Sequence, residues 1–114
     1  MNPAQLERIV STAEKACALV VAQPKDVLAR QRLFNVLTLV VDPTFVGEGP
    51  EFDHVADLLS EARVWADIVR TRISALPKHA NRVLSILAIQ HPARELLPIL
   101  TDLRRELARM HDDG

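Results

Sequence analysis

Residues 52–76, FDHVADLLSEARVWADIVRTRISAL, decide the fold of this 114-residue chain. Apolar side chains recur along this stretch at alternating steps of three and four residues. Such spacing places them on one face of an α-helix as a continuous heptad seam, which packs against other helices. The seam consists of Phe52, Val55, Leu59, Ala62, Ala66, Val69, Ile73 and Leu76. We predict a helix over about 50–76 that is the long central element of a bundle.

Proline residues mark the boundaries of the other helices, because proline suits the first turn of a helix and ends a preceding one. Helices are predicted at about 3–22, 24–41, 50–76, 77–90 and 98–111, with a loop at 42–50. We expect Pro92 to end the fourth helix and Pro98 to kink the remaining segment or to start a new helix. No run alternates with the two-residue period of a β-strand. The fold class is therefore all-α: a single-domain, four- to five-helix antiparallel bundle with a proline-interrupted C-terminal segment.

Composition and charge narrow the class of protein. Hydrophobic residues make up 48% of the chain and the net charge is -1, so it lacks the general positive field that drives non-specific binding to nucleic acids or acidic membranes. Cys17 is the single cysteine; it has apolar neighbours, and we predict a buried structural thiol. No signal peptide and no apolar run of membrane-spanning length is seen, so the expectation is a cytoplasmic protein. The excess of arginine (11) over lysine (3) suggests a GC-rich bacterial genome.

Signatures of enzymes and metal sites are missing from the sequence. With three glycines in all, no dinucleotide-binding motif, phosphate-binding loop or nucleophile elbow is present. Glu51 and His54 form one Glu-x-x-His motif, but di-iron helical bundles need two. A carboxylate at position 51 is also explained by the dipole at the start of the predicted helix. We predict no catalytic residue, no metal and no cofactor.

Charged residues are unevenly distributed along the chain. Between residues 42 and 61 there are six acids and no Lys or Arg, whereas the segment 63–82 is basic. The bases of this segment are Arg63, Arg70, Arg72, Lys78 and Arg82. Acids at the start of a helix and bases at its end complement the helix dipole. The alternative is that these five bases contact phosphates, as in a small DNA-associated regulator.

The third and fourth predicted helices carry more apolar residues than one buried face requires. A bundle of this size has no interior helix, so a surplus apolar surface is covered either by the C-terminal segment or by a second chain. The residues predicted to form such an interface are Leu58, Trp65, Ile68, Ile86 and Ile89. Trp65 equally fits a plain core tryptophan. We predict a small protein–protein interaction module, acting as an adaptor, a chaperone or a regulatory subunit, that forms a homodimer or binds a helical partner.

Overall fold

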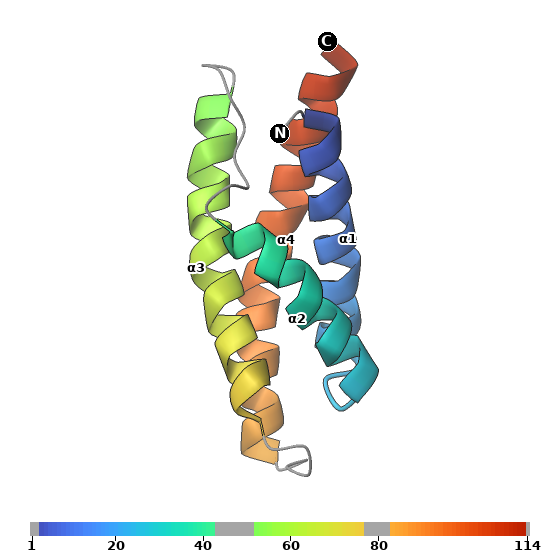
Figure 1. Ribbon diagram of the computed structural model, residues 1–114, viewed down its shortest axis with the longest axis vertical. Helices are drawn as coiled ribbons and strands as arrows, with labels where there is room; N and C mark the ends of the chain where they lie inside the picture. Colours follow the sequence, from blue (N-terminus) through green and yellow to red (C-terminus); the bar gives the residue numbers. More distant parts are fainter. Residues whose placement is uncertain (1–2, 43–51, 77–82, 114) are drawn as a thin grey trace.

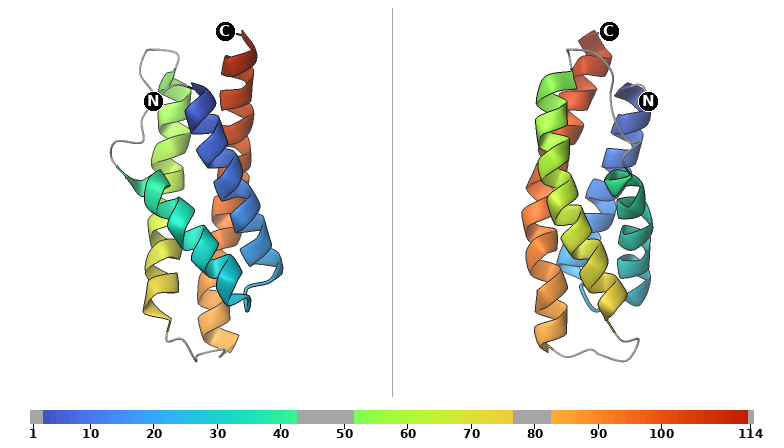
Figure 2. Two further views of the ribbon diagram at one scale, coloured as in Figure 1. Left: turned by 45° about the vertical axis from the view of Figure 1, so that its right-hand side comes forward. Right: turned by 60° about the vertical axis from the view of Figure 1, so that its left-hand side comes forward.

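The computed structural model describes residues 3–42, 52–76 and 83–113, which form four α-helices (Figure 1). They are α1 (Pro3–Ala22), α2 (Val27–Val41), α3 (Asp53–Ala75) and α4 (Val83–Asp113). Successive helices run in opposite directions, and the shorter α2 crosses the others obliquely (Figures 1 and 2). The all-helical fold class is confirmed for the described residues.

Each helix packs against two neighbours, in the order α1, α2, α3, α4 and back to α1. This ring surrounds one apolar core. The fully buried row of α4 consists of Ile89, Ala93, Leu96, Leu100, Leu103 and Leu107. The buried residues of α1 are Leu6, Val10, Ala13, Cys17 and Val20. The heptad seam predicted for α3 is confirmed, since its first six residues are buried and Ile73 and Leu76 pack half-buried against the core.

The predicted interruption of the C-terminal segment is wrong. α4 is one helix of 31 residues that passes through both Pro92 and Pro98, so the separate helix expected at 98–111 is its second half. At 1.5 Å per residue α4 is about 46 Å long, close to the 47 Å length of the molecule. The longest helix, which packs between α1 and α3, is therefore α4 and not the helix at 50–76.

A hydrogen bond from α3 explains why α4 continues past its first proline. Pro92 has no N–H, so the carbonyl of Ala88, four residues earlier, lacks its partner within the helix. The Arg72 side chain donates from Nη1 to this carbonyl at 2.8 Å. The acceptor that proline leaves unpaired is thus satisfied from a neighbouring helix, an interaction that local sequence patterns do not reveal.

Two hydrogen bonds between α1 and α4 reinforce the same part of α4. The Cys17 thiol donates to the Ala93 carbonyl at 3.1 Å. Conversely, the Gln90 amide donates from Nε2 to the carbonyl of Val21, in the last turn of α1, at 2.9 Å. The proline turn of α4 is therefore tied to both of its neighbours.

The start of α2 differs from the prediction because of Asp26. Its Oδ1 accepts hydrogen bonds from the backbone N–H groups of Leu28 at 3.0 Å and Ala29 at 3.2 Å. This N-cap satisfies donors that a helix end leaves free, and the helix begins at Val27 instead of residue 24. The predictions for residues 43–51, which cover most of the loop and the start of the third helix, and for residues 77–82, at the start of the fourth, lie outside the described residues.

We predict that the Arg72 bond stabilises the fold only while residue 92 is a proline. Arg72→Ala should lower the free energy of unfolding by about 1–2 kcal/mol, because it leaves the Ala88 carbonyl unpaired. In a Pro92→Ala background the restored N–H supplies a partner, and the same substitution should cost less than about 0.5 kcal/mol. Urea unfolding of the four proteins measures this coupling.

Arg70→Ala is the matched control for this cycle. Arg70 pairs with Asp67 on the surface of α3, and the cost of its loss should be the same in both backgrounds. An equal cost of Arg72→Ala with and without Pro92 would contradict the explanation.

Candidate functional site

A groove runs between α1 and α2 on the outside of the bundle, with a volume of ≈ 550 Å³. Its lining consists of Thr12, Lys15, Ala16 and Leu19 from α1, and Ala29, Arg32, Asn35, Val36 and Leu39 from α2. On each helix these residues follow one another at steps that keep them on one face. Of the apolar members, Ala29 and Val36 belong to the core, whereas Leu19 and Leu39 lie beside the core stripes and are exposed by 37% and 50%.

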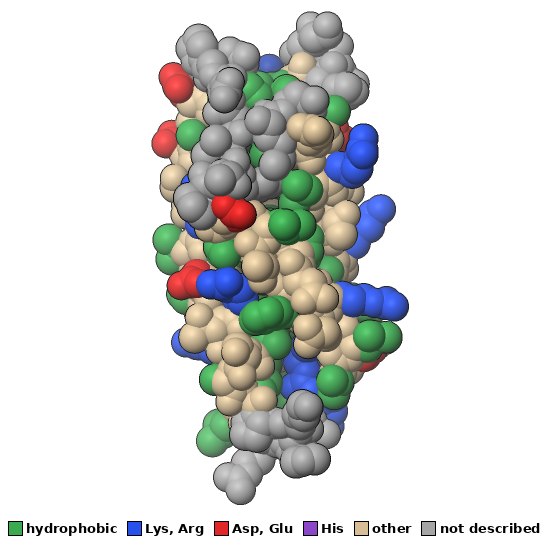
Figure 3. Space-filling view, in the orientation of Figure 1, with side chains coloured by type: hydrophobic (Ala, Val, Ile, Leu, Met, Phe, Trp, Pro, Cys, Tyr) green, Lys and Arg blue, Asp and Glu red, His purple; other side chains and the backbone are tan. Residues whose placement is uncertain are grey.

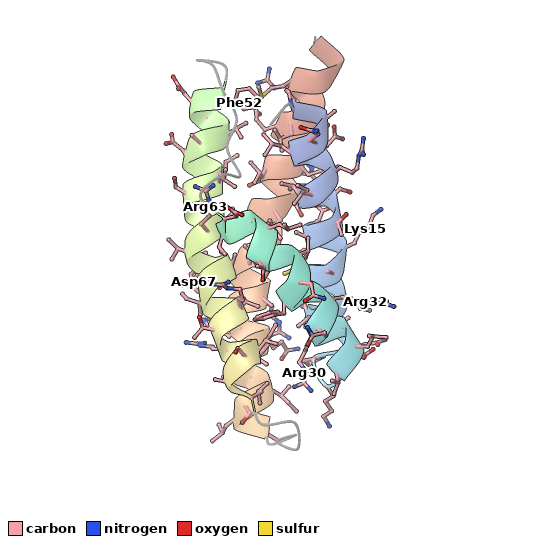
Figure 4. All side chains as sticks on the ribbon, in the orientation of Figure 1. Lys15, Arg30, Arg32, Phe52, Arg63 and Asp67 are labelled. Carbon is pink, nitrogen blue, oxygen red and sulfur yellow. The ribbon has the colours of Figure 1, made fainter. Side chains whose placement is uncertain are left out.

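The rim of this groove is basic. Lys15 and Arg32 extend from α1 and α2 toward the same side of the molecule (Figure 4). Neither of them takes part in the three ion pairs formed among the described residues, and no carboxylate lines the groove. Figure 3 shows Lys and Arg side chains gathered along this edge of the bundle. The groove therefore combines an apolar floor with uncompensated positive charge.

The predicted interface residues do not form one exposed surface. Ile89 is fully buried in the core and Ile86 is 6% exposed, so their assignment to a partner surface is wrong: the neighbouring helices cover them within the chain. The other three, Leu58, Trp65 and Ile68, are half-buried on α3.

Trp65 packs against the core and meets His91 of α4 edge to face, with 6.5 Å between the ring centroids. Trp65 therefore contributes to the contact between α3 and α4. This packing fits the interpretation of Trp65 as a core tryptophan.

The most exposed apolar side chains lie elsewhere and were not predicted. They are Val27, Leu28, Leu39, Val64, Val83, Leu84 and Leu87. A signal for the groove was present in the sequence: Leu19 and Leu39 are large apolar residues outside the core stripes of two successive helices.

Three of the bases predicted to contact phosphates have partners within the chain. Arg63 donates to the carbonyls of Val40 and Asp42, both at 3.2 Å, and so caps the end of α2. Arg70 pairs with Asp67 at 3.2 Å, and Arg72 serves the Ala88 carbonyl as described above. Lys78 and Arg82 lie outside the described residues.

Of the two ligand-type residues of the Glu-x-x-His motif, only the histidine lies among the described residues. His54 is exposed in the first turn of α3, while Glu51 lies outside the described residues. Within residues 3–42, 52–76 and 83–113, no three His, Cys, Asp or Glu side chains are grouped so that they could hold a metal ion.

One described helix is long and apolar enough to cross a membrane, over Val83–Met110 of α4. The core helix of a bundle has the same composition. In this structure the apolar face of α4 contacts α1 and α3. Of the most apolar stretch of 18 residues in this helix, 33% is buried within the bundle.

Comparison of the chain with protein-family models, with curated proteins and with solved structures finds no match.

Cys17 is buried in the C-terminal half of α1, and its burial was predicted. Burial raises the pKa of its thiol to about 12, because the thiolate is poorly solvated there. The protonated thiol is also the form that donates to the Ala93 carbonyl. A thiol in this state is a structural group and not a nucleophile.

We predict that this thiol makes the stability of the protein fall at alkaline pH. The thiol ionises near pH 9 in the unfolded chain but only near pH 12 in the folded one. Its contribution is therefore complete below pH 9 and is lost as pH rises from 9 to 12, by about 1.4 kcal/mol per pH unit. Urea unfolding of the wild type and of Cys17→Ser, which keeps a donor but does not titrate, measures the difference. A difference that stays constant from pH 8 to pH 11 would contradict the buried thiol.

Proposed function

We propose that this chain is a small, non-enzymatic helical interaction module of the cytoplasm, whose α1–α2 groove binds an amphipathic helix that carries carboxylates. The observation that carries the proposal is the groove itself, in which an apolar floor is bordered by two unpaired bases. Apolar grooves on helical proteins commonly bind the apolar face of a partner helix.

The dimensions of the groove suit a helix. The lining of α1 extends from Thr12 to Leu19, which is about 10 Å at 1.5 Å per residue, or two helical turns. A partner helix of that length offers apolar side chains at positions i, i+3 or i+4, and i+7. Ala16 and Ala29 are small, so they leave room for such side chains to approach the backbones of α1 and α2.

The charge of the rim favours an acidic partner. Carboxylates on the flanks of the bound helix would compensate Lys15 and Arg32, which have no ion-pair partner among the described residues. A second copy that used the same face would bring these bases against each other. The partner that fits the groove best is therefore another chain, with an adaptor, chaperone or regulatory role for this one.

We predict that the groove distinguishes helices by charge. The probes are two fluorescent peptides of 18 residues with the same apolar face, one flanked by glutamates and the other by lysines. The glutamate peptide should bind about 3- to 30-fold more tightly, the value expected for two exposed ion pairs. Fluorescence anisotropy measures both affinities, and Lys15→Glu combined with Arg32→Glu should reverse the preference.

A substitution of the groove floor separates apolar binding from charge attraction. Leu39→Glu should weaken binding of both peptides at least tenfold, because it places a carboxylate in the apolar part of the groove. Leu84→Glu is the matched control, since Leu84 is exposed at the start of α4, away from the groove. Equal effects of the two substitutions, or equal affinities for the two peptides, would refute this site.

The predicted homodimer is a separate part of the proposal. It needs a surface other than the basic groove, and the half-buried residues Leu58, Trp65 and Ile68 of α3 are what is left of the predicted interface. Sedimentation equilibrium from 1 to about 100 μM should show a mass that rises toward twice 12.7 kDa. A monomer at all these concentrations would rule out self-association as part of the function.

A further inference from the structure

Arg30 is a buried cation without a partner. The residue is 8% exposed and lies toward the lower end of α2 (Figure 4). Its Nη1 is shielded from solvent and has no hydrogen-bond acceptor. The carboxylate four residues earlier, Asp26, has the i, i+4 spacing that favours an ion pair with Arg30. It caps the start of α2 instead, and no ion pair between the two side chains is formed.

An unpaired guanidinium inside a protein is unfavourable. Arginine keeps its charge at every physiological pH, so burial cannot be relieved by loss of a proton. The free energy lost by desolvation is recovered only when an anion accepts its hydrogen bonds. A guanidinium that is nearly buried, has one shielded nitrogen without an acceptor in the chain, and also lines a pocket favours an anionic ligand in that pocket.

The arginine lines a pocket that is suited to such a ligand. The pocket lies between α2 and the C-terminal end of α3 and has a volume of ≈ 390 Å³. Its lining consists of Val27, Arg30, Gln31, Phe34, Ile73, Ser74 and Leu76. Four of these seven are apolar, and Ser74 adds a hydroxyl that can donate a second hydrogen bond.

We infer that this pocket binds a monocarboxylate with an apolar tail, whose carboxylate pairs with the Arg30 guanidinium. One guanidinium balances one negative charge, and a planar carboxylate matches its two parallel N–H groups. The walls formed by Val27, Phe34, Ile73 and Leu76 cover the tail. A phosphate dianion would need more donors than Arg30 and Ser74 supply.

The carboxylate must come from outside this part of the chain. No Asp or Glu lines the pocket. The sequence that follows Leu76, residues 77–82, contains no acid either. Two sources share the required chemistry: a free apolar carboxylate, and the C-terminal residue of a peptide that ends in an apolar side chain. This inference is independent of the groove, which uses other residues.

The test measures the thermal midpoint of the full chain with defined probes. These are octanoate, its uncharged analogue octanamide, an acetylated pentapeptide ending in leucine as the free acid, the same peptide as an amide, and inorganic phosphate. A ligand that binds the folded state raises the midpoint with its concentration. We expect octanoate or the peptide acid to do so, and octanamide, the peptide amide and phosphate to have no effect.

Substitution of Arg30 tests whether the rise in the thermal midpoint comes from binding in this pocket. Arg30→Met should weaken binding of the effective probe at least tenfold, and the ligand-free variant should unfold at the same or a higher temperature, since an unpaired buried charge is replaced by an apolar chain. Arg94→Met, at an exposed arginine of α4, is the matched control and should bind like the wild type. Ser74→Ala should weaken binding by a smaller factor than Arg30→Met.

Every outcome of this test either supports or overturns the inference. A response to octanoate alone supports a free carboxylate as the ligand, and a response to the peptide acid but not to its amide supports capture of a peptide C-terminus. Equal responses to octanoate and octanamide, a response to phosphate, equal binding by Arg30→Met and the wild type, or no response to any probe at 10 mM would overturn the inference.

Discussion

The fully buried row of side chains along α4 is the interaction on which the rest of the structure depends. These residues pack against α1 on one side and α3 on the other, and from Ile89 to Leu107 they extend over about 27 Å of the 47 Å length of the molecule. The row is continuous only because α4 remains one helix through Pro92 and Pro98. A break at residue 92 would separate Ile89 from Leu96 and Leu100, and α1 and α3 would lose their common support.

Two bases of the segment 63–82 donate hydrogen bonds to backbone carbonyls of neighbouring helices. Arg63 satisfies carbonyls at the end of α2, and Arg72 satisfies the carbonyl that Pro92 leaves free. Both use a guanidinium to supply donors that the backbone lacks. The groove on the opposite pair of helices is bordered instead by Lys15 and Arg32, which take part in none of the ion pairs described above.

Much of the fold could be predicted from the sequence, because the period of apolar residues records which face of each helix is buried. The seam of α3 and the leucines of α4 follow from this period, and the bounds of α1 follow from the prolines that flank it. The proline turn could not be predicted, because its stability depends on Arg72, sixteen residues before the carbonyl that it serves. The burial of Ile86 and Ile89 depends likewise on the helices packed around them.

The candidate sites were harder to predict than the core. The spacing of Asp26 and Arg30 suggests an ion pair, but the carboxylate has a second possible role as an N-cap, and the structure uses that role. The groove is lined in part by residues beside the core stripes of α1 and α2, and only the packing of these two helices brings Leu19 and Leu39 to the same surface. The period of apolar residues predicts reliably which residues are buried. It predicts less well which exposed residues of different helices lie next to each other.

The pairing of Arg72 with the Ala88 carbonyl also sets an order in which related sequences can diverge. A chain that has exchanged Pro92 for another residue no longer needs the arginine and is free to lose it later. The reverse order passes through an intermediate with an unsatisfied carbonyl in its longest helix. Positions 72 and 92 should therefore covary among homologues, with proline at 92 found almost always together with a long donor side chain at 72.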